Sequence, residues 1–361
     1  MNCIQSWPEP VVRVQSLSDS GIRVIPERYV KRQIMKPSFK FTTPAPPREI
    51  NIPVINLENL LSQDLMVRQT TLDLISASCR EWGFFQIVNH GVSNLLMDRV
   101  GEVWREFFHL PVEEKQAYAN CPTTYEGYGS RLGIQKGAKL DWSDYFFLNY
   151  LPTWQRNEHK WPTFPSSCKE IVGEYNEAMV KLCRELMKIL STNLGLEENH
   201  LQQALGGDEV GASLRVNYYP KCPQPDLTFG LSPHSDPGAM TILLADDQVS
   251  GLQVRKDDNW VTVKPVPNAF IVNIGDQVEV LSNGNYTSVE HRVVVNSCAE
   301  RVSLAFFYNP KGDKTIQPAK ELITANVPAQ YLPMTFNEYR TFVRTRGPSG
   351  KSSVESIKSP R

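Results

Sequence analysis

An excess of charge of either sign is missing from this chain. Its 38 Lys and Arg residues are nearly matched by 39 Asp and Glu residues, which leaves a formal net charge of −1. A chain so balanced has no field that gathers polyanions, so we expect no nucleic-acid partner. Long apolar runs are missing too. No stretch reaches the roughly 18 apolar residues of a membrane span, so we expect no membrane insertion.

Paired cysteines are also absent. The seven cysteines are odd in number, scattered, and without a C-x-x-C pair, which argues against a disulfide framework and against a zinc ribbon. The opening residues, MNCIQSWPEP, lack the basic flank and apolar run of a secretory signal peptide. We therefore expect reduced thiols in an intracellular protein, in the cytoplasm or also in the nucleus. Separately, we expect the protein to be a monomer.

What the chain does contain divides it into four parts. Its 361 residues are 41% hydrophobic, enough for one large core or two smaller ones. Prolines interrupt residues 1–49, which read as an N-terminal arm. Helical spacing dominates 50–206, strand-like segments fill 207–312, and 313–361 holds a last helix and a tail.

Individual elements follow from local patterns. We expect helices over 66–82, 95–108 and 171–194, strands over 50–57 and 84–92, and irregular chain over 120–165. Strands of the third part are expected at 241–244, 252–254, 260–263, 269–274, 292–295 and 303–308. Thr335 and Glu338 have the spacing of a capping box, which predicts a helix beginning after Thr335.

Two histidines and one aspartate stand out in the strand-rich part. His234 and Asp236 are two residues apart in LSPHSDPG, so on a strand both side chains point to the same side. His291, in SVEHRVVV, can join them from a later strand folded alongside, as in a barrel wall. A lone His-x-Asp pair arises often by chance. Two histidines and a carboxylate nevertheless match the ligand set of a non-haem Fe(II) oxygenase, which keeps the remaining positions open for co-substrate and O₂.

Arg301 and Ser303 strengthen this interpretation. They are again two residues apart on an expected strand, so the guanidinium and the hydroxyl face the same interior. A planar guanidinium binds a carboxylate through two parallel hydrogen bonds. The pair therefore predicts an anchor for a carboxylate beside the metal.

These residues carry a family resemblance. The run from Arg215 to Asp236 (RVNYYPKCPQPDLTFGLSPHSD), with His291, Arg301 and Ser303, resembles the plant 2-oxoglutarate- and Fe(II)-dependent dioxygenases. The segments WGFFQIVNHG (82–91) and FFHLPVEEK (107–115) are similar to the N-terminal domain of that family, so the resemblance covers roughly 50–345.

The resemblance implies a mainly β fold with α-helices (α+β). A double-stranded β-helix, or jelly-roll, core would occupy 207–312, with a helical N-terminal domain at 50–206 and a C-terminal lid helix. His234, Asp236 and His291 match the positions of the iron ligands. Arg301 and Ser303 match the groups that hold the distal carboxylate of 2-oxoglutarate, and Asn217 and Tyr219 match further contacts to it. Fe(II), 2-oxoglutarate and O₂ are thus the implied cofactor and co-substrates, with ascorbate as reductant.

Three other arginines bear on the substrate. Arg215 alternates with Asn217 and Tyr219, so it should face the same interior, where a buried guanidinium needs an anion. Arg340 and Arg344 are four residues apart on the expected C-terminal helix and lie on one side of it. Arginines near a helix C-terminus can also face water and complement the helix dipole, so their role stays open at this point.

The whole chain most resembles the jasmonate-induced oxygenases, also called jasmonic acid oxidases. Three segments carry this closer similarity: SWPEPVVRVQSLS (6–18), KGAKLDWSDYFFLNYLP (136–152) and the helix with Arg340 and Arg344. The resemblance implies hydroxylation of jasmonic acid to 12-hydroxyjasmonate, an inactive hormone, with release of succinate and CO₂. Arg215, Arg340 and Arg344 would hold its carboxylate, and the apolar body would lie against Phe147, Phe307 and Phe336.

Two alternatives remain from the sequence. A flavonoid oxygenase of the anthocyanidin synthase type acts on planar polyphenols without a carboxylate, for which unpaired buried arginines would be costly. A hormone-binding protein with an inactive site would need no intact ligand set, whereas this chain keeps all five residues of the metal and carboxylate motif.

Overall fold

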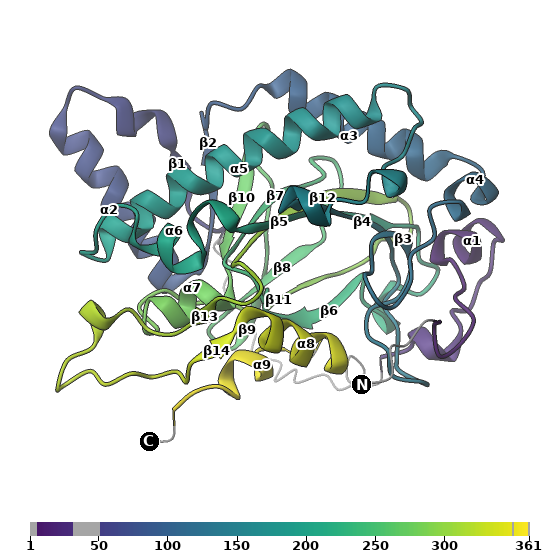
Figure 1. Ribbon diagram of the computed structural model, residues 1–361. Coiled ribbons are helices and arrows are strands. Elements are labelled where there is room, and N and C mark those ends of the chain that lie inside the picture. Colours follow the sequence, from purple (N-terminus) through teal and green to yellow (C-terminus); the bar gives the residue numbers. More distant parts are fainter. Residues whose placement is uncertain (1–5, 32–50, 349, 360–361) are drawn as a thin grey trace, which may run out of the picture.

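The computed structural model describes residues 6–31, 51–348 and 350–359 (Figure 1). The predicted strand start at residue 50 and the part of the arm over 32–49 lie outside these residues. The helices are α1 Val14–Asp19, α2 Leu65–Glu81, α3 Asn94–His109, α4 Val112–Gln116, α5 Cys168–Asn193, α6 His200–Leu205, α7 Asp276–Leu281, α8 Phe336–Arg346 and α9 Ser352–Glu355. Among the described residues, no helix is both long and apolar enough to cross a membrane.

Most of the strands lie in the second half of the chain. They are β1 Val54–Asn56, β2 Phe84–Val88, β3 Gly127–Gly129, β4 Asp144–Leu151, β5 Gly211–Tyr219, β6 Leu231–His234, β7 Met240–Leu244, β8 Leu252–Lys256, β9 Asn259–Thr262, β10 Phe270–Ile274, β11 His291–Val293, β12 Arg301–Asn309, β13 Thr315–Ile316 and β14 Met334–Thr335.

Two sheets form the core of the fold. The larger has the order β1-β2-β10-β7-β12-β5-β4-β3, and a four-stranded sheet has the order β6-β11-β8-β9. Several neighbours in the large sheet, such as β2 and β10 or β12 and β5, are far apart in sequence. All its pairs except β1–β2 are antiparallel. This is the double-stranded β-helix that the sequence predicted, with helices added, so the fold class is confirmed.

Alternation along the strands explains how the large sheet is covered. On β12, Leu304 and Phe306 are buried in the main hydrophobic cluster, as are Leu214 and Val216 on β5. The same cluster contains the apolar faces of α3 and α5, which cross above the sheet in Figure 1. Residues between these positions point to the opposite side of the sheet. That opposite side faces the smaller sheet and forms the site described below.

The prediction of irregular chain over 120–165 was wrong in one important respect. This range contains β3 and β4, and β4 pairs with β5 along most of its length. Its sequence, DYFFLNYL, is rich in the aromatic residues that favour strands, but the surrounding glycines and prolines obscured the signal. The predicted strand over 84–92 was too long, since β2 ends at Val88.

The helix predictions were close to the structure. The three long helices begin and end within a few residues of the predicted positions. The capping box is confirmed: the Thr335 hydroxyl accepts from the backbone N–H of Glu338, whose carboxylate accepts from the backbone N–H of Thr335. The large sheet takes strands from both 50–206 and 207–312, so the boundary between these two parts stays a prediction.

The described part of the N-terminal arm is packed onto β4. The backbone N–H groups of Val14 and Gln15, at the start of α1, donate to the carboxylate of Asp144 at 2.9 and 2.8 Å. Val14 and Tyr29 are fully buried. The arm therefore supports the strand that forms one wall of the site.

Candidate active site

A cavity of about 770 Å³ lies between the two sheets and α8. All the residues that the sequence singled out as metal ligands, co-substrate contacts or substrate contacts line it. They are Phe147, Arg215, Asn217, Tyr219, His234, Asp236, His291, Arg301, Ser303, Phe307, Phe336, Arg340 and Arg344. The fold thus brings together residues from β4, β5, β6, β11, β12 and α8, although their individual roles stay predictions.

His234, Asp236 and His291 form a compact group at the smaller sheet. His234 ends β6 and lies directly opposite His291, the first residue of β11. Each of the three residues offers one ligand atom, and these atoms lie within 4.8 Å of one another. Oδ1 of Asp236 lies 3.5 Å from Nε2 of His234 and 3.7 Å from Nε2 of His291. The group fits a metal bound by two imidazoles and one carboxylate on a single face.

Neighbouring groups fix which atoms face the metal position. Nδ1 of His234 lies 2.9 Å from the Ser232 carbonyl oxygen, and Nδ1 of His291 lies 3.1 Å from that of Val289. Both imidazoles can therefore donate through Nδ1 and keep Nε2 for a metal, an arrangement common among metal-binding histidines. Burial lowers the pKa of His291 to about 4, which favours the neutral ring that binds a metal.

Asp236 is held by two residues that the sequence analysis did not single out. Its Oδ2 accepts from the Thr241 hydroxyl at 2.6 Å and from the Asn273 amide at 2.9 Å, which leaves Oδ1 for the metal. Burial alone would raise the pKa of Asp236, but the neighbouring histidines hold it well below its usual range. Thr241 fell inside a predicted strand, but only its place beside Asp236 in the fold reveals its role.

The predicted 2-oxoglutarate contacts lie next to the metal group, at one end of β5 and β12. Arg301 is paired across the strands with Tyr219, and Ser303 with Asn217. Arg301 is 4% exposed, and its guanidinium donates to the Ser303 hydroxyl at 3.1 Å and to the Val249 carbonyl at 3.1 Å. Burial lowers its pKa. A buried, oriented guanidinium with a hydroxyl beside it suits the distal carboxylate of a diacid.

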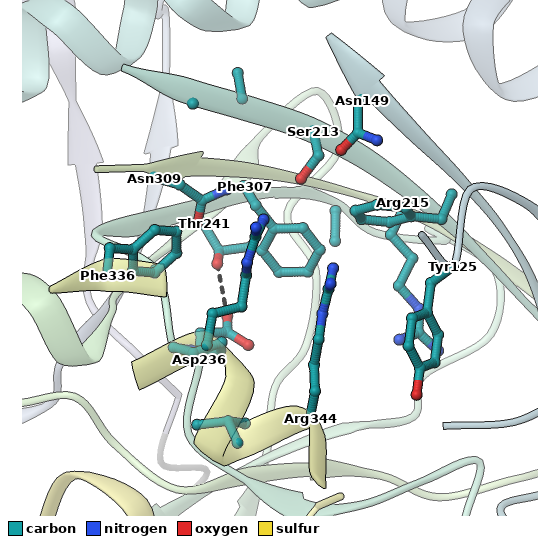
Figure 2. A pocket seen from close by; sticks show the side chains of 18 of the residues that line it. Tyr125, Asn149, Ser213, Arg215, Asp236, Thr241, Phe307, Asn309, Phe336 and Arg344 are labelled. Carbon is teal, nitrogen blue, oxygen red and sulfur yellow. Dashed lines mark hydrogen bonds between the residues drawn. The ribbon is translucent and has the colours of Figure 1, made fainter. Parts of the chain in front are cut away.

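Three more arginines converge on the cavity from two sides. Arg215 projects from β5, where its Nε donates to Asn217 Oδ1 at 2.7 Å and its guanidinium lies over the Tyr145 ring. Arg340 and Arg344 project from α8, and Figure 2 shows Arg344 reaching from this helix into the cavity. Among the described residues, no carboxylate forms an ion pair with any of the three.

The electrostatics of α8 favour a bound anion. Burial and the neighbouring Arg344 lower the pKa of Arg340 to about 10, and burial also lowers the pKa of Arg344. Two partly buried like charges four residues apart repel one another, and an anion between them would reduce that cost. The alternative in which these arginines face water is wrong, because both line the cavity.

Aromatic side chains complete the wall. Phe147 on β4 is paired with Arg215, and Phe307 on β12 with Ser213. Phe336 begins α8 and is buried, with the Arg340 guanidinium 5.7 Å from the centre of its ring. Figure 2 shows Phe307 and Phe336 on one side of the cavity and Tyr125 beside Arg344 on the other. The cavity thus joins a cationic region to an apolar one.

Fold and site together define a class: a non-haem iron oxygenase that uses 2-oxoglutarate. The comparisons agree. The profile of the 2OG-Fe(II) oxygenase superfamily matches residues 210–310, and that of the non-haem dioxygenase in morphine synthesis N-terminal matches 52–164. Jasmonate-induced oxygenase 2 of Arabidopsis thaliana is 60% identical over 99% of this chain and 96% of its own, and Jasmonate-induced oxygenase 3 of the same plant is 58% identical over the full length of both.

A solved structure agrees as well. The crystal structure of JOX2 in complex with 2OG, Fe and JA has a TM-score of 0.89 and 59% identity, over 98% of this chain and all of that one. The chain belongs to the jasmonate-induced oxygenases of the 2OG-Fe(II) oxygenase superfamily. Its cofactor is Fe(II) and its co-substrate is 2-oxoglutarate.

Proposed function

We propose that this protein hydroxylates jasmonic acid at the end of its pentenyl chain, giving 12-hydroxyjasmonate. The observation that carries the proposal is the convergence of Arg215, Arg340 and Arg344 on one cavity without a carboxylate partner among the described residues. A small apolar acid supplies the missing anion and fills the aromatic part of the cavity. The JA bound in the JOX2 structure, jasmonic acid, is such a molecule.

Iron and 2-oxoglutarate supply the oxidising chemistry when bound: one oxygen atom of O₂ enters the substrate C–H bond, the other enters succinate, and CO₂ leaves. The protein decides which C–H bond is presented. His234, Asp236 and His291 hold the metal on one face, and Thr241 and Asn273 keep Oδ2 of Asp236 occupied. Arg301 and Ser303 hold the distal carboxylate of 2-oxoglutarate, with Asn217 and Tyr219 beside them.

The arginine group sets the register of the substrate. With the carboxylate held by Arg215, Arg340 and Arg344, the rest of the molecule would extend along the aromatic wall. Phe147, Phe307 and Phe336 would confine its ring and chain, so that the end far from the carboxylate lies nearest the metal. Fixing the substrate at one end converts binding energy into orientation of the reacting bond.

The experiment is a product assay. Purified protein with Fe(II), ascorbate and 2-oxoglutarate is incubated with a panel of plant acids and flavonoids, and products are measured by mass and by NMR. We expect jasmonic acid to gain one oxygen at its terminal carbon, with equimolar succinate. A gain of oxygen by flavonoids alone would favour the anthocyanidin synthase type. Binding of jasmonic acid without succinate release would indicate a hormone-binding protein.

We also infer that the protein acts as a monomer, in the cytoplasm or also in the nucleus. Six cysteines among the described residues are free thiols, which fits a reducing compartment. Sedimentation of the purified protein and imaging of a fluorescent fusion would test the two parts of this inference separately.

A further inference from the structure

Ser213 places an unused hydroxyl on the cavity wall, between aromatic and cationic side chains. It lies on β5 between Phe307 of β12 and Asn149 of β4, in register with both. It lines the cavity and is 5% exposed. Among the described residues, none forms a hydrogen bond with its hydroxyl. A hydroxyl that loses water when a ligand fills the cavity needs a new partner, because an unpaired buried polar group is costly.

Asn149, next to Ser213, is held in one orientation by a buried acid. Its side-chain amide nitrogen donates to Oε2 of Glu126 at 3.0 Å, and its backbone N–H donates to Oε1 of Glu126 at 3.2 Å. Glu126 is 4% exposed. The carboxylate accepts only, so it fixes which end of the amide turns toward it. Oδ1 of Asn149 is therefore the end left on the side of Ser213, as Figure 2 shows.

The pair lies apart from the ionic contacts already assigned. Along β5, pocket-facing residues follow in the order Tyr219, Asn217, Arg215 and Ser213. The first two belong to the proposed 2-oxoglutarate site. Arg215 belongs to the carboxylate clamp, the group of Arg215, Arg340 and Arg344 proposed to hold the substrate carboxylate. Figure 2 shows Ser213 and Asn149 on the strand wall, with Arg344 approaching from the opposite side. Ser213 and Asn149 are themselves uncharged, so this part of the wall suits a neutral polar group.

We propose that Ser213 and Asn149 form a subsite that selects for a neutral oxygen of the substrate, and that Glu126 is a positioning residue for it. The inference rests on the proposed function, under which that oxygen is the ring carbonyl of jasmonic acid. The Ser213 hydroxyl donates to the carbonyl oxygen. Asn149 presents an acceptor beside it, which a ring hydroxyl could also use.

This arrangement ranks three related ligands. A ring carbonyl receives one hydrogen bond, from Ser213. A ring alcohol, made by borohydride reduction of the ketone, accepts from Ser213 and also donates to Asn149. A ring methylene satisfies neither group and leaves the hydroxyl buried without a partner. In the wild-type protein we expect the deoxo acid to have a KM about three- to tenfold above that of jasmonic acid. The alcohol should bind at least as well as jasmonic acid.

The first variant removes the donor. Ser213→Ala should raise the KM for jasmonic acid about three- to tenfold and leave that of the deoxo acid nearly unchanged. The wild type and Ser213→Ala should need the same concentration of 2-oxoglutarate for half-maximal rate. Ser297→Ala, at an exposed serine, is the matched control. Equal effects of Ser213→Ala on the two acids would overturn the subsite.

The second variant tests the positioning role. Glu126→Gln keeps the size of the side chain but has a single acceptor, which the backbone N–H of Asn149 occupies. Its amide nitrogen then faces the Asn149 side chain, which should turn over and present Nδ2 to the cavity. The KM for the ketone should therefore fall relative to the KM for the alcohol. A merely structural role of Glu126 would change both KM values together and leave their ratio unchanged.

The wild-type assays separate the two levels of inference. If the wild-type protein does not oxidise jasmonic acid, the proposed function fails and takes the subsite assignment with it. If it oxidises jasmonic acid and the deoxo acid with equal KM, the proposed function stands and the subsite fails. That comparison needs no variant, so it is decisive even if Ser213→Ala or Glu126→Gln does not fold.

Discussion

The hydroxyl of Tyr339 donates a 2.6 Å hydrogen bond to Oδ2 of Asp276. Tyr339 lies on α8 immediately before Arg340, and Asp276 begins α7. The backbone N–H of Asp276 in turn donates to the carbonyl oxygen of Asp236 at 2.8 Å. The side chains of Tyr339 and Asp276 are both buried. The helix that carries Arg340 and Arg344 is thus joined through Asp276 to the segment that carries Asp236.

Tyr339→Phe should loosen this connection. The free energy of unfolding should fall by about 1.5–3 kcal/mol, because a buried hydrogen bond to a carboxyl group is lost. The KM for the prime substrate should rise more than the half-saturation for 2-oxoglutarate, since α8 carries Arg340 and Arg344. Urea unfolding and steady-state kinetics measure the two effects. Unchanged values of both would show that the bond does not hold α8 in place.

Asp276 should make stability depend on pH. Burial raises the pKa of its carboxyl group from 3.8 to about 7. Between these values the folded protein binds more protons than the unfolded chain, so this group makes unfolding easier as pH rises from about 4 to about 7. Asp276→Asn cannot titrate, so its stability relative to the wild type should increase across that window.

The measurement is urea unfolding of both proteins from pH 5 to pH 8, with a chelator present so that metal binding does not contribute. Asp258→Asn, at a fully exposed aspartate, controls for the loss of one negative charge. Parallel curves for the wild type and Asp276→Asn would contradict the assigned shift.

Removing a metal ligand should abolish turnover without unfolding the protein. Asp236→Ala loses the carboxylate of the metal group, and His234→Ala or His291→Ala loses an imidazole, so iron binding weakens in each case. Iron content, turnover and circular dichroism are measured together. His159→Ala, at an exposed histidine, should behave as the wild type. Full activity of Asp236→Ala at wild-type iron content would falsify the assignment of the metal group.

Arg301→Ala should selectively weaken the binding of 2-oxoglutarate. The expected cost is about 2–4 kcal/mol, because a buried contact between opposite charges is lost. The rate is measured against the concentration of 2-oxoglutarate at saturating jasmonic acid. The loss should appear as a higher concentration of 2-oxoglutarate at half-maximal rate. Arg340→Ala is the matched control, since that arginine lies on α8 and should leave this titration nearly unchanged. An unchanged half-saturation for Arg301→Ala would remove Arg301 from the role.

The carboxylate clamp predicts discrimination against the methyl ester. Methyl jasmonate keeps the apolar body but not the charge, and Arg340→Ala or Arg344→Ala removes a partner of that charge. Each change should weaken jasmonate use about 10- to 150-fold, the equivalent of about 1.5–3 kcal/mol. Competition assays with the acid and the ester measure the discrimination.

Two controls belong to the clamp. Thr341→Ala, exposed on the same helix, tests for damage to α8, and Arg23→Ala, exposed on the arm, tests for loss of a positive charge. Neither should alter jasmonate use. Oxidation of the ester as fast as the acid would show that the clamp is wrong, although the oxygenase assignment would stand.

The sequence by itself determined the chemistry of the site. Side chains two residues apart on a strand must face the same side, so His234 with Asp236, and Arg301 with Ser303, could be paired from spacing alone. The capping box of Thr335 and Glu338 likewise fixed the start of α8, because its contacts are local. These features depend on backbone geometry within a few residues, which the order of residues specifies.

Only the tertiary structure decided which distant residues share the cavity wall. Asn149, Ser213, Phe307, Thr241 and Asn273 lie side by side across five strands, although their numbers span more than a third of the chain. Their register depends on how the sheet pairs, and β4 was hidden among glycines and prolines. Whether Arg340 and Arg344 face water or the cavity was likewise undecided until α8 was placed against the sheets, because a helix has the same local geometry in both cases.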